Sequence, residues 1–183
     1  MCASSGGVVA PPADKGFPIV GLGASAGGLE ALEEFFRRMP PDAGMAFVVV
    51  THQHPSHTSL LPELLRKHTR MPVTEAIDGA QVQPNRIYIS RPDYYVGILD
   101  GRLHLMKSKE DGGVRLPIDF FLRALAEDQQ ERSVGIVLSG SGNDGTLGPQ
   151  AIKGAGGMAI AQEAASARYA GMPGRAISTG VVD

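Results

Sequence analysis

Hydrophobic residues along the chain follow two alternating spacings. Short apolar runs at residues 19–22 and 47–51 are typical of buried strands. Apolar residues at helical spacing predict amphipathic helices over residues 29–39 and 59–68. Strands that alternate with helices are typical of a parallel sheet covered by helices. We therefore predict an α/β protein, with three α/β/α layers around a mainly parallel, doubly wound sheet.

The middle of the chain departs from this alternation. Residues 94–99 and 102–106 flank Asp100-Gly101, a pair that supplies the positive φ angles of a tight hairpin turn. We expect an antiparallel hairpin at the edge of the parallel sheet. Helical spacing returns over residues 118–125, and a further strand over 134–138 leads into a glycine-rich segment.

Composition fits one globular domain. The 183 residues are 43% hydrophobic and 20% charged, and a net charge of −2 gives no electrostatic case for nucleic acid or an anionic membrane. The lone Cys2 excludes an internal disulfide, and no apolar run approaches the roughly 18 residues of a membrane span. We expect a cytoplasmic location without membrane insertion.

The two ends of the chain differ from its interior. Residues 1–16 are small, polar and interrupted by prolines, and we expect them to form a flexible leader before a domain of residues 17–183. Apolar residues directly after Gly180 suggest a strand that is cut short. The natural protein is therefore expected to continue beyond Asp183.

A serine lies on a glycine-lined turn after the first predicted strand. Gly23-Ala24-Ser25-Ala26-Gly27 fits the G-x-S-x-G pattern, in which small neighbours let the backbone turn sharply and expose the hydroxyl. Unpaired N–H groups of the following helix favour an anion at the same place. Ser25 is therefore a candidate nucleophile, although the pattern is weak evidence in a chain with 24 glycines.

A minor alternative for this turn is nucleotide binding. Residues 21–26 also satisfy the relaxed dinucleotide pattern G-x-G-x-x-G/A. That site expects an acidic residue at the end of the next strand. Here the next strand ends in Thr51 and His52, so nucleotide binding is disfavoured.

Three predicted strands end in side chains that could cooperate. Ligands of doubly wound sheets gather beyond the carboxyl ends of the strands, where this chain carries Ser25, His52 and Asp144. A serine nucleophile needs a base and an acid that orients the base, and this set offers one of each. Asn143-Asp144-Gly145 is also a strong turn sequence. Its position after the third strand end favours the catalytic interpretation.

Five histidines compete for the role of base. His52 directly follows a strand and is preferred, with His54 as the alternative. His57, His68 and His104 are expected to be structural or exposed.

The histidine cluster also suggests a zinc hydrolase. Residues 52–57 resemble the H-x-H-x-D-H motif of metallo-β-lactamase-type hydrolases, with ligands His52, His54 and His57. Ser56 replaces the aspartate of that motif. This alternative is less favoured, and we expect neither a metal nor a cofactor.

Five segments carry motifs of one known family: residues 23–28, 48–52, 117–121, 138–145 and 171–173. Together they resemble the catalytic domain of bacterial chemotaxis protein-glutamate methylesterases. The versions fused to a chemotaxis methyltransferase are the most similar. The resemblance covers nearly everything except the leader.

This resemblance implies hydrolysis of γ-glutamyl methyl esters on the cytoplasmic region of chemoreceptors, with glutamine deamidation in some members. It implies Ser25 as nucleophile, His52 as general base and Asp144 as orienting acid. Backbone N–H groups at Ala26 and Ser141 would form the oxyanion hole. Expected partners are a methyl-accepting chemoreceptor and a fused or separate methyltransferase, but no nucleic acid.

The resemblance also implies a substrate groove bordered by Met172 and Pro173. The chain departs from the family pattern in having Ala26 instead of threonine, Ser141 instead of methionine and Thr51 instead of glutamine. A side-chain donor is thereby lost beside the nucleophile.

A regulatory receiver domain normally precedes the esterase domain in this family, whereas only about 16 residues precede it here. Any control of activity is therefore expected to come from fused segments or a partner. A non-catalytic signalling or interaction module with an esterase fold is the remaining alternative.

Overall fold

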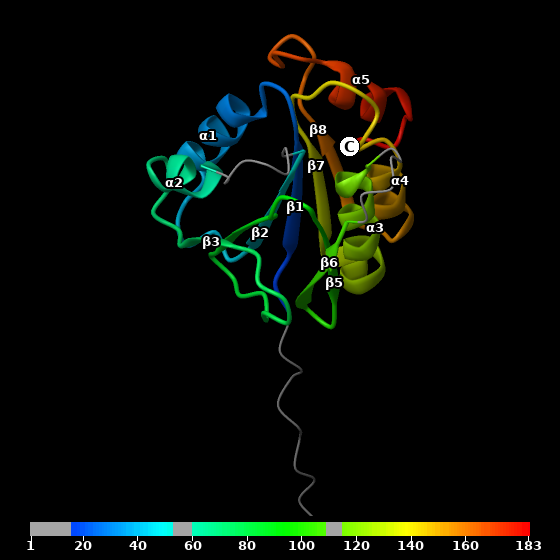
Figure 1. Ribbon diagram of the computed structural model, residues 1–183. Helices are drawn as coiled ribbons and strands as arrows, with labels where there is room; N and C mark the ends of the chain where they lie inside the picture. The colour runs from blue at the N-terminus through cyan, green and yellow to red at the C-terminus, as the bar shows by residue number, and fades with distance from the viewer. Residues whose placement is uncertain (1–15, 53–59, 109–114) are drawn as a thin grey trace, which may run out of the picture.

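The computed structural model describes residues 16–52, 60–108 and 115–183. Within these ranges a six-stranded sheet has the order β3-β4-β2-β1-β7-β8, and every neighbouring pair is parallel (Figure 1). Its strands are β1 (Ile19–Ala24), β2 (Ala46–Thr51), β3 (Val73–Glu75), β4 (Ile87–Ile89), β7 (Ser133–Val137) and β8 (Met158–Ala161). The chain builds outward from β1 in both directions, which confirms the predicted doubly wound sheet.

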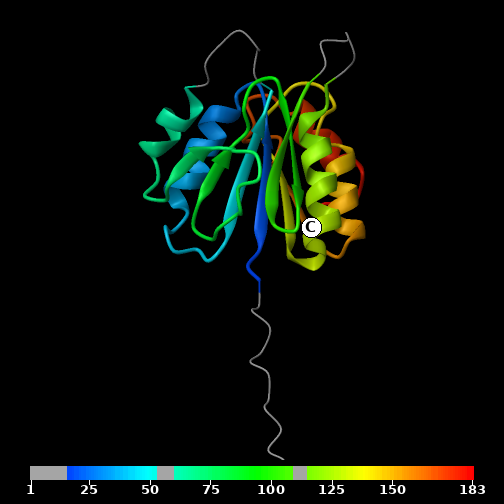
Figure 2. The same ribbon diagram turned by 60° about the horizontal axis from the view of Figure 1, so that its bottom comes forward.

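Helices cover both faces of this sheet, as Figures 1 and 2 show from two sides. One face carries α1 (Gly28–Arg38) and α2 (Leu61–Arg66). The other carries α3 (Pro117–Gln129), α4 (Leu147–Gly154) and α5 (Gly171–Ser178), with the short 3-10 helix η1 (Gln130–Arg132) after α3. The predicted α/β/α layering is therefore confirmed.

The predicted hairpin forms from β5 (Tyr94–Leu99) and β6 (Arg102–Lys107). Its turn residues Asp100 and Gly101 have φ angles of 51° and 68°, as that dipeptide predicts. The expected place at the edge of the parallel sheet is wrong, because β5 and β6 form a separate two-stranded sheet. The apolar face of the hairpin instead joins the core beneath α3, where Val96, Ile98 and Leu103 are buried.

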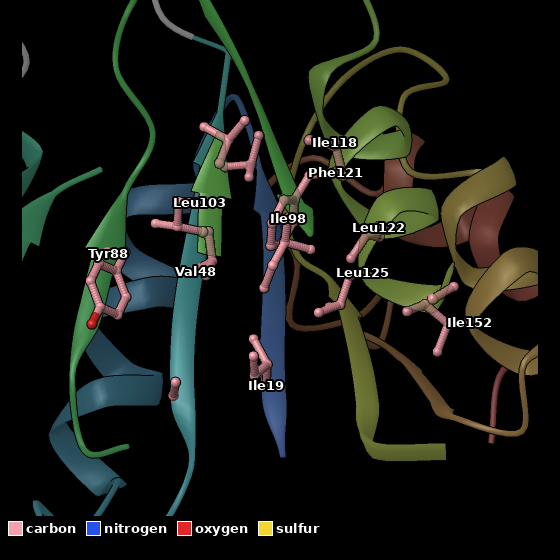
Figure 3. Close-up of a cluster of buried hydrophobic side chains, with 14 of the residues drawn as sticks. Ile19, Val48, Tyr88, Ile98, Leu103, Ile118, Phe121, Leu122, Leu125 and Ile152 are labelled. Atoms are coloured by element: carbon pink, nitrogen blue, oxygen red, sulfur yellow. The ribbon is translucent and has the colours of Figure 1, made fainter. Parts of the chain in front are cut away.

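Two hydrophobic cores lie on opposite faces of the central sheet. Side chains alternate along β2, so that Phe47 and Val49 pack with α1 and α2 while Val48 and Val50 pack with α3 and the hairpin. Figure 3 shows the core on the α3 face, with Ile118 and Leu122 of α3 turned toward the sheet. A sheet buried on both faces explains the unbroken apolar runs of its strands.

Glycines in β1 let α3 approach the sheet closely. A Cβ atom at Gly21 would lie 2.6 Å from Cδ2 of Leu122, and one at Gly23 would lie 2.2 Å from Cγ2 of Ile118. At either distance, a side chain larger than hydrogen would force Leu122 or Ile118 to shift. The first turn of α3 therefore lies directly against the carboxyl end of β1.

The chain ends were only partly predictable. Residues 1–15 of the expected leader lie outside the described residues. The expected final strand is wrong, because residues 181–183 have no regular structure. Asp183 instead contacts β8, where its N–H donates to the Ala159 carbonyl at 2.8 Å and its carboxylate accepts from the Ala159 N–H at 3.0 Å. No helix in the described ranges is long and apolar enough to cross a lipid bilayer.

Candidate active site

Three loops meet at the carboxyl edge of the sheet, which points upward in Figure 1. β1 lies between β2 and β7 and pairs with both. Ser25 follows β1, His52 follows β2, and Asp144 lies in the loop between β7 and α4. The parallel pairing therefore gathers three residues that are far apart in the sequence.

Hydrogen bonds connect these three side chains in a line. Ser25 Oγ lies 3.1 Å from His52 Nδ1, and His52 Nε2 lies 2.9 Å from Asp144 Oδ2. An ionised carboxylate only accepts hydrogen bonds, so the proton of neutral imidazole lies on Nε2. Nδ1 is then an acceptor for the Ser25 hydroxyl. The two ring nitrogens thus exchange the positions that they have in the chymotrypsin-type arrangement.

Asp144 is held at the N-terminus of α3. Its side chain is 1% exposed. Oδ2 accepts from the Ile118 N–H at 2.9 Å, and Oδ1 accepts from the N–H groups of Asp119 at 2.8 Å and Gly145 at 3.0 Å. These bonds fix the carboxylate, and the positive end of the α3 dipole stabilises negative charge beside His52.

A second buried acid, Asp119, makes the reciprocal contact with the N-terminus of α4. It belongs to α3, and its Oδ1 accepts from the N–H groups of Leu147 at 2.9 Å and Gly148 at 2.6 Å at the start of α4. Its Oδ2 is buried without a hydrogen-bond partner among the described residues. Burial raises the pKa of Asp119, and the nearby Asp144 carboxylate raises it further. Sequence reasoning assigned no role to Asp119.

The turn that carries Ser25 is fastened to the loop after β7. The Ser25 N–H donates to the Ser139 carbonyl at 3.0 Å, and the buried Ser139 hydroxyl donates to the Ala26 carbonyl at 2.9 Å. The same hydroxyl accepts from the Tyr169 N–H at 3.0 Å. The left-handed residue of the turn is Gly27, with a φ of 68°. Ser139 was not predicted, because its sequence context suggested only a glycine-rich loop.

The remaining predicted site residues lie around this turn. Among the described residues, the N–H groups of Ala26 and Ser141 donate to no protein acceptor, so both can still donate to a ligand. Met172 and Pro173 lie in the first turn of α5, and both are buried. Met172 packs beneath Gly140, where a Cβ would lie 2.2 Å from its sulfur. Met172 therefore supports the loop, and the bordering of a groove stays a prediction.

The other histidines are placed as follows. His54 and His57, on which the zinc alternative depends, lie outside the described residues. His68 pairs with Glu33 of α1 at 3.4 Å, and His104 is exposed on β6. No group of three potential ligand side chains suited to a metal ion occurs in the part of the chain that the structure describes.

A cavity of about 160 Å³ adjoins His52. It lies between the end of β2, the segment that enters β5 and the start of α3. Its lining consists of Thr51, His52, Arg91, Pro92, Asp93, Tyr94, Tyr95, Arg115 and Pro117. Of these residues, the sequence analysis singled out Thr51 and His52, and Pro117 as part of a family motif, but it assigned no role to the two arginines.

A family model described as CheB methylesterase matches residues 20–183. The chain belongs to the CheB methylesterase family. The predicted resemblance is therefore confirmed. The fold agrees with the crystal structure of the Thermotoga maritima CheB methylesterase catalytic domain, with a TM-score of 0.84 and 33% identity over 91% of this chain and 90% of that one.

Relatives of the CheB methylesterase family differ in overall length. A Halobacterium salinarum protein named protein-glutamate methylesterase/protein-glutamine glutaminase is 34% identical over 91% of this chain and 49% of its own length. The chain thus spans about half the length of such curated relatives. An uncharacterized 104.1 kDa protein of Rhodobacter capsulatus is 39% identical over 67% of this chain, which is 13% of that protein.

Proposed function

We propose that this chain is the catalytic unit of a protein-glutamate methylesterase, a serine hydrolase that removes methyl esters from glutamate side chains of chemoreceptors. The observation that carries the proposal is the continuous hydrogen-bonded line from Ser25 through His52 to the buried Asp144. Membership of the CheB methylesterase family supports it. Serine, base and acid have the relative arrangement that nucleophilic acyl transfer requires.

In the proposed reaction, His52 Nδ1 takes the proton of Ser25 as Oγ attacks the ester carbonyl. Asp144 holds the ring and stabilises the imidazolium that forms. The N–H groups of Ala26 and Ser141 donate to the oxyanion. The C–OCH₃ bond then breaks, and His52 returns the proton to the departing methanol.

Water completes the cycle by attacking the acyl-enzyme, again with His52 as base. The products are the glutamate carboxylate, methanol and free Ser25. Base catalysis contributes a factor on the order of 10²–10⁴ in rate. The oxyanion site contributes roughly 10²–10³ for each donor.

The same site could release ammonia from a glutamine side chain, since amide and ester give the same acyl-enzyme. Relatives whose names include protein-glutamine glutaminase support this second activity. The proposed partners are the cytoplasmic region of a methyl-accepting chemoreceptor and a chemotaxis methyltransferase, fused or separate. The proposed location is cytoplasmic.

Methanol release tests this function. The probe is a synthetic peptide that contains a glutamate γ-methyl ester. We expect the wild-type protein to release methanol and Ser25→Ala to lose at least about 10³-fold in kcat without loss of folding, because the hydroxyl supplies the attacking atom. Ser178→Ala, at the exposed end of α5, is the matched control that keeps activity.

Two results would contradict the proposal. The first is an active Ser25→Ala protein, which would remove the nucleophile from the account. The second is a folded wild-type protein that binds the peptide but releases no methanol. The second result would favour the non-catalytic interaction module.

A further inference from the structure

The cavity beside His52 carries more positive than negative charge. Arg91 and Arg115 line it together with one acid, Asp93. Arg115 pairs with Asp93 at 3.6 Å, a loose contact between partly exposed side chains. Arg91 has no carboxylate partner among the described residues. The lining side chains therefore leave one positive charge unmatched.

Arg91 is held by an aromatic ring. Its guanidinium carbon lies 5.2 Å from the centre of the Tyr94 ring, a cation–π distance. A cation–π contact uses none of the guanidinium N–H donors, so these stay available to a ligand. Two N–H groups of arginine match the two oxygens of a carboxylate, which makes such pairs short and directional.

The size and position of the cavity restrict what it can hold. A volume of about 160 Å³ accommodates the end of one side chain rather than a nucleotide. His52 forms part of the wall, so a group in the cavity lies beside an ester at Ser25. Side chains three or four residues apart on a helix have Cβ atoms about 5–6 Å apart. One substrate helix could therefore occupy both places.

We propose that this cavity is a specificity subsite, in which Arg91 and Arg115 bind the carboxylate of an acidic side chain that neighbours the esterified glutamate in the same substrate segment. The inference rests on the proposed function and deepens it. The enzyme then prefers esters within acidic segments. Each hydrolysed ester also leaves a new glutamate, which can occupy the subsite when a neighbouring ester is cleaved.

Two peptides test the subsite. Both carry one glutamate γ-methyl ester in a helical sequence, with either glutamate or glutamine at the positions three and four residues away on both sides. The measured quantity is the ratio of kcat/KM for the glutamate peptide to that for the glutamine peptide. In Arg91→Gln and Arg115→Gln we expect this ratio to fall about tenfold, the effect of one charge-assisted hydrogen bond.

Arg123→Gln is the matched control. Arg123 is exposed on α3 and does not line the cavity, yet its replacement removes the same charge. We expect its ratio to equal that of the wild type. Equal ratios in all four proteins would overturn the subsite, and so would a fall of the same size in Arg123→Gln, which would indicate long-range attraction.

A binding experiment tests the subsite independently of the proposed function. Fluorescence anisotropy measures the affinity of each peptide for Ser25→Ala protein with and without Arg91→Gln. We expect the second substitution to weaken the glutamate peptide about tenfold more than the glutamine peptide. This result supports the subsite even if the wild type releases no methanol, whereas equal weakening of both peptides overturns it.

Discussion

At the scale of single residues, two buried acids bind the N-termini of two neighbouring helices in a reciprocal way. Asp144 lies just before α4 and accepts from the first N–H groups of α3, while Asp119 in α3 accepts from the first N–H groups of α4. Each carboxylate satisfies donors that would otherwise be buried without partners. The exchange fixes the position of Asp144 relative to His52.

Asp119 makes the stability of the fold depend on pH. Its pKa is raised by burial, so the folded protein retains this proton to a higher pH than the unfolded chain, where the value is 3.8. The stability contributed by the protonated group is fully present below pH 3.8 and is lost as the pH rises through the raised pKa.

Asp119→Asn removes this dependence while keeping an oxygen for the Leu147 and Gly148 N–H groups. We expect the unfolding free energy of the variant minus that of the wild type to increase as the pH rises above 3.8. The slope is at most about 1.4 kcal/mol per pH unit, the limit for one proton. Urea denaturation at a series of pH values measures it. A difference that falls with pH would contradict the assignment.

At the scale of elements, the site depends on how closely α3 packs against β1. Gly23 lies under Ile118, and the Ile118 N–H binds Asp144. Any outward shift of the first turn of α3 therefore moves the acid away from His52. The glycine links packing of the core to geometry of the site.

Gly23→Ala should lower both stability and activity. The added Cβ would lie 2.2 Å from Cγ2 of Ile118, and such overpacking costs about 1–3 kcal/mol. We expect kcat to fall as well. We also expect Ile118→Ala to lower the free energy of unfolding less in the Gly23→Ala protein than in the wild type. Chemical denaturation and methanol release measure the two effects.

Gly174→Ala is the control for this substitution. Gly174 lies in α5, a Cβ added there would meet open space, and alanine favours a helix. Wild-type behaviour of Gly23→Ala, equal to that of Gly174→Ala, would show that contact between α3 and β1 does not position Asp144.

Element types were predictable where one spacing dominates a segment. The long patterns over α1, β2 and α3 gave the right elements, and Asp100-Gly101 gave the right turn. The hairpin was misplaced because its alternation shows which face is buried, but not which layer covers that face. Likewise the apolar residues after Gly180 suggested a strand. The structure has no strand there, and the Asp183 carboxylate accepts the hydrogen bond of the Ala159 N–H in β8.

At the scale of the whole molecule, the sheet brings together three loops that are separated by long stretches of chain. The two cores anchor β1, β2 and β7 from opposite faces, so their carboxyl ends form one rigid edge. The proposed triad could be predicted because parallel topology gathers strand ends. Ser139 and the Arg91 cavity could not, because they depend on packing between loops.

The central claim is that His52 and Asp144 activate Ser25. Covalent labelling by a fluorophosphonate, with the adduct located by peptide mass spectrometry, tests it most directly, because an unactivated serine does not react. We predict one adduct on Ser25 in the wild type, none in Ser25→Ala, and a rate about 10²–10⁴-fold lower in His52→Gln. Failure of the folded wild-type protein to react, or labelling of Ser25 at an undiminished rate in His52→Gln, would contradict the account.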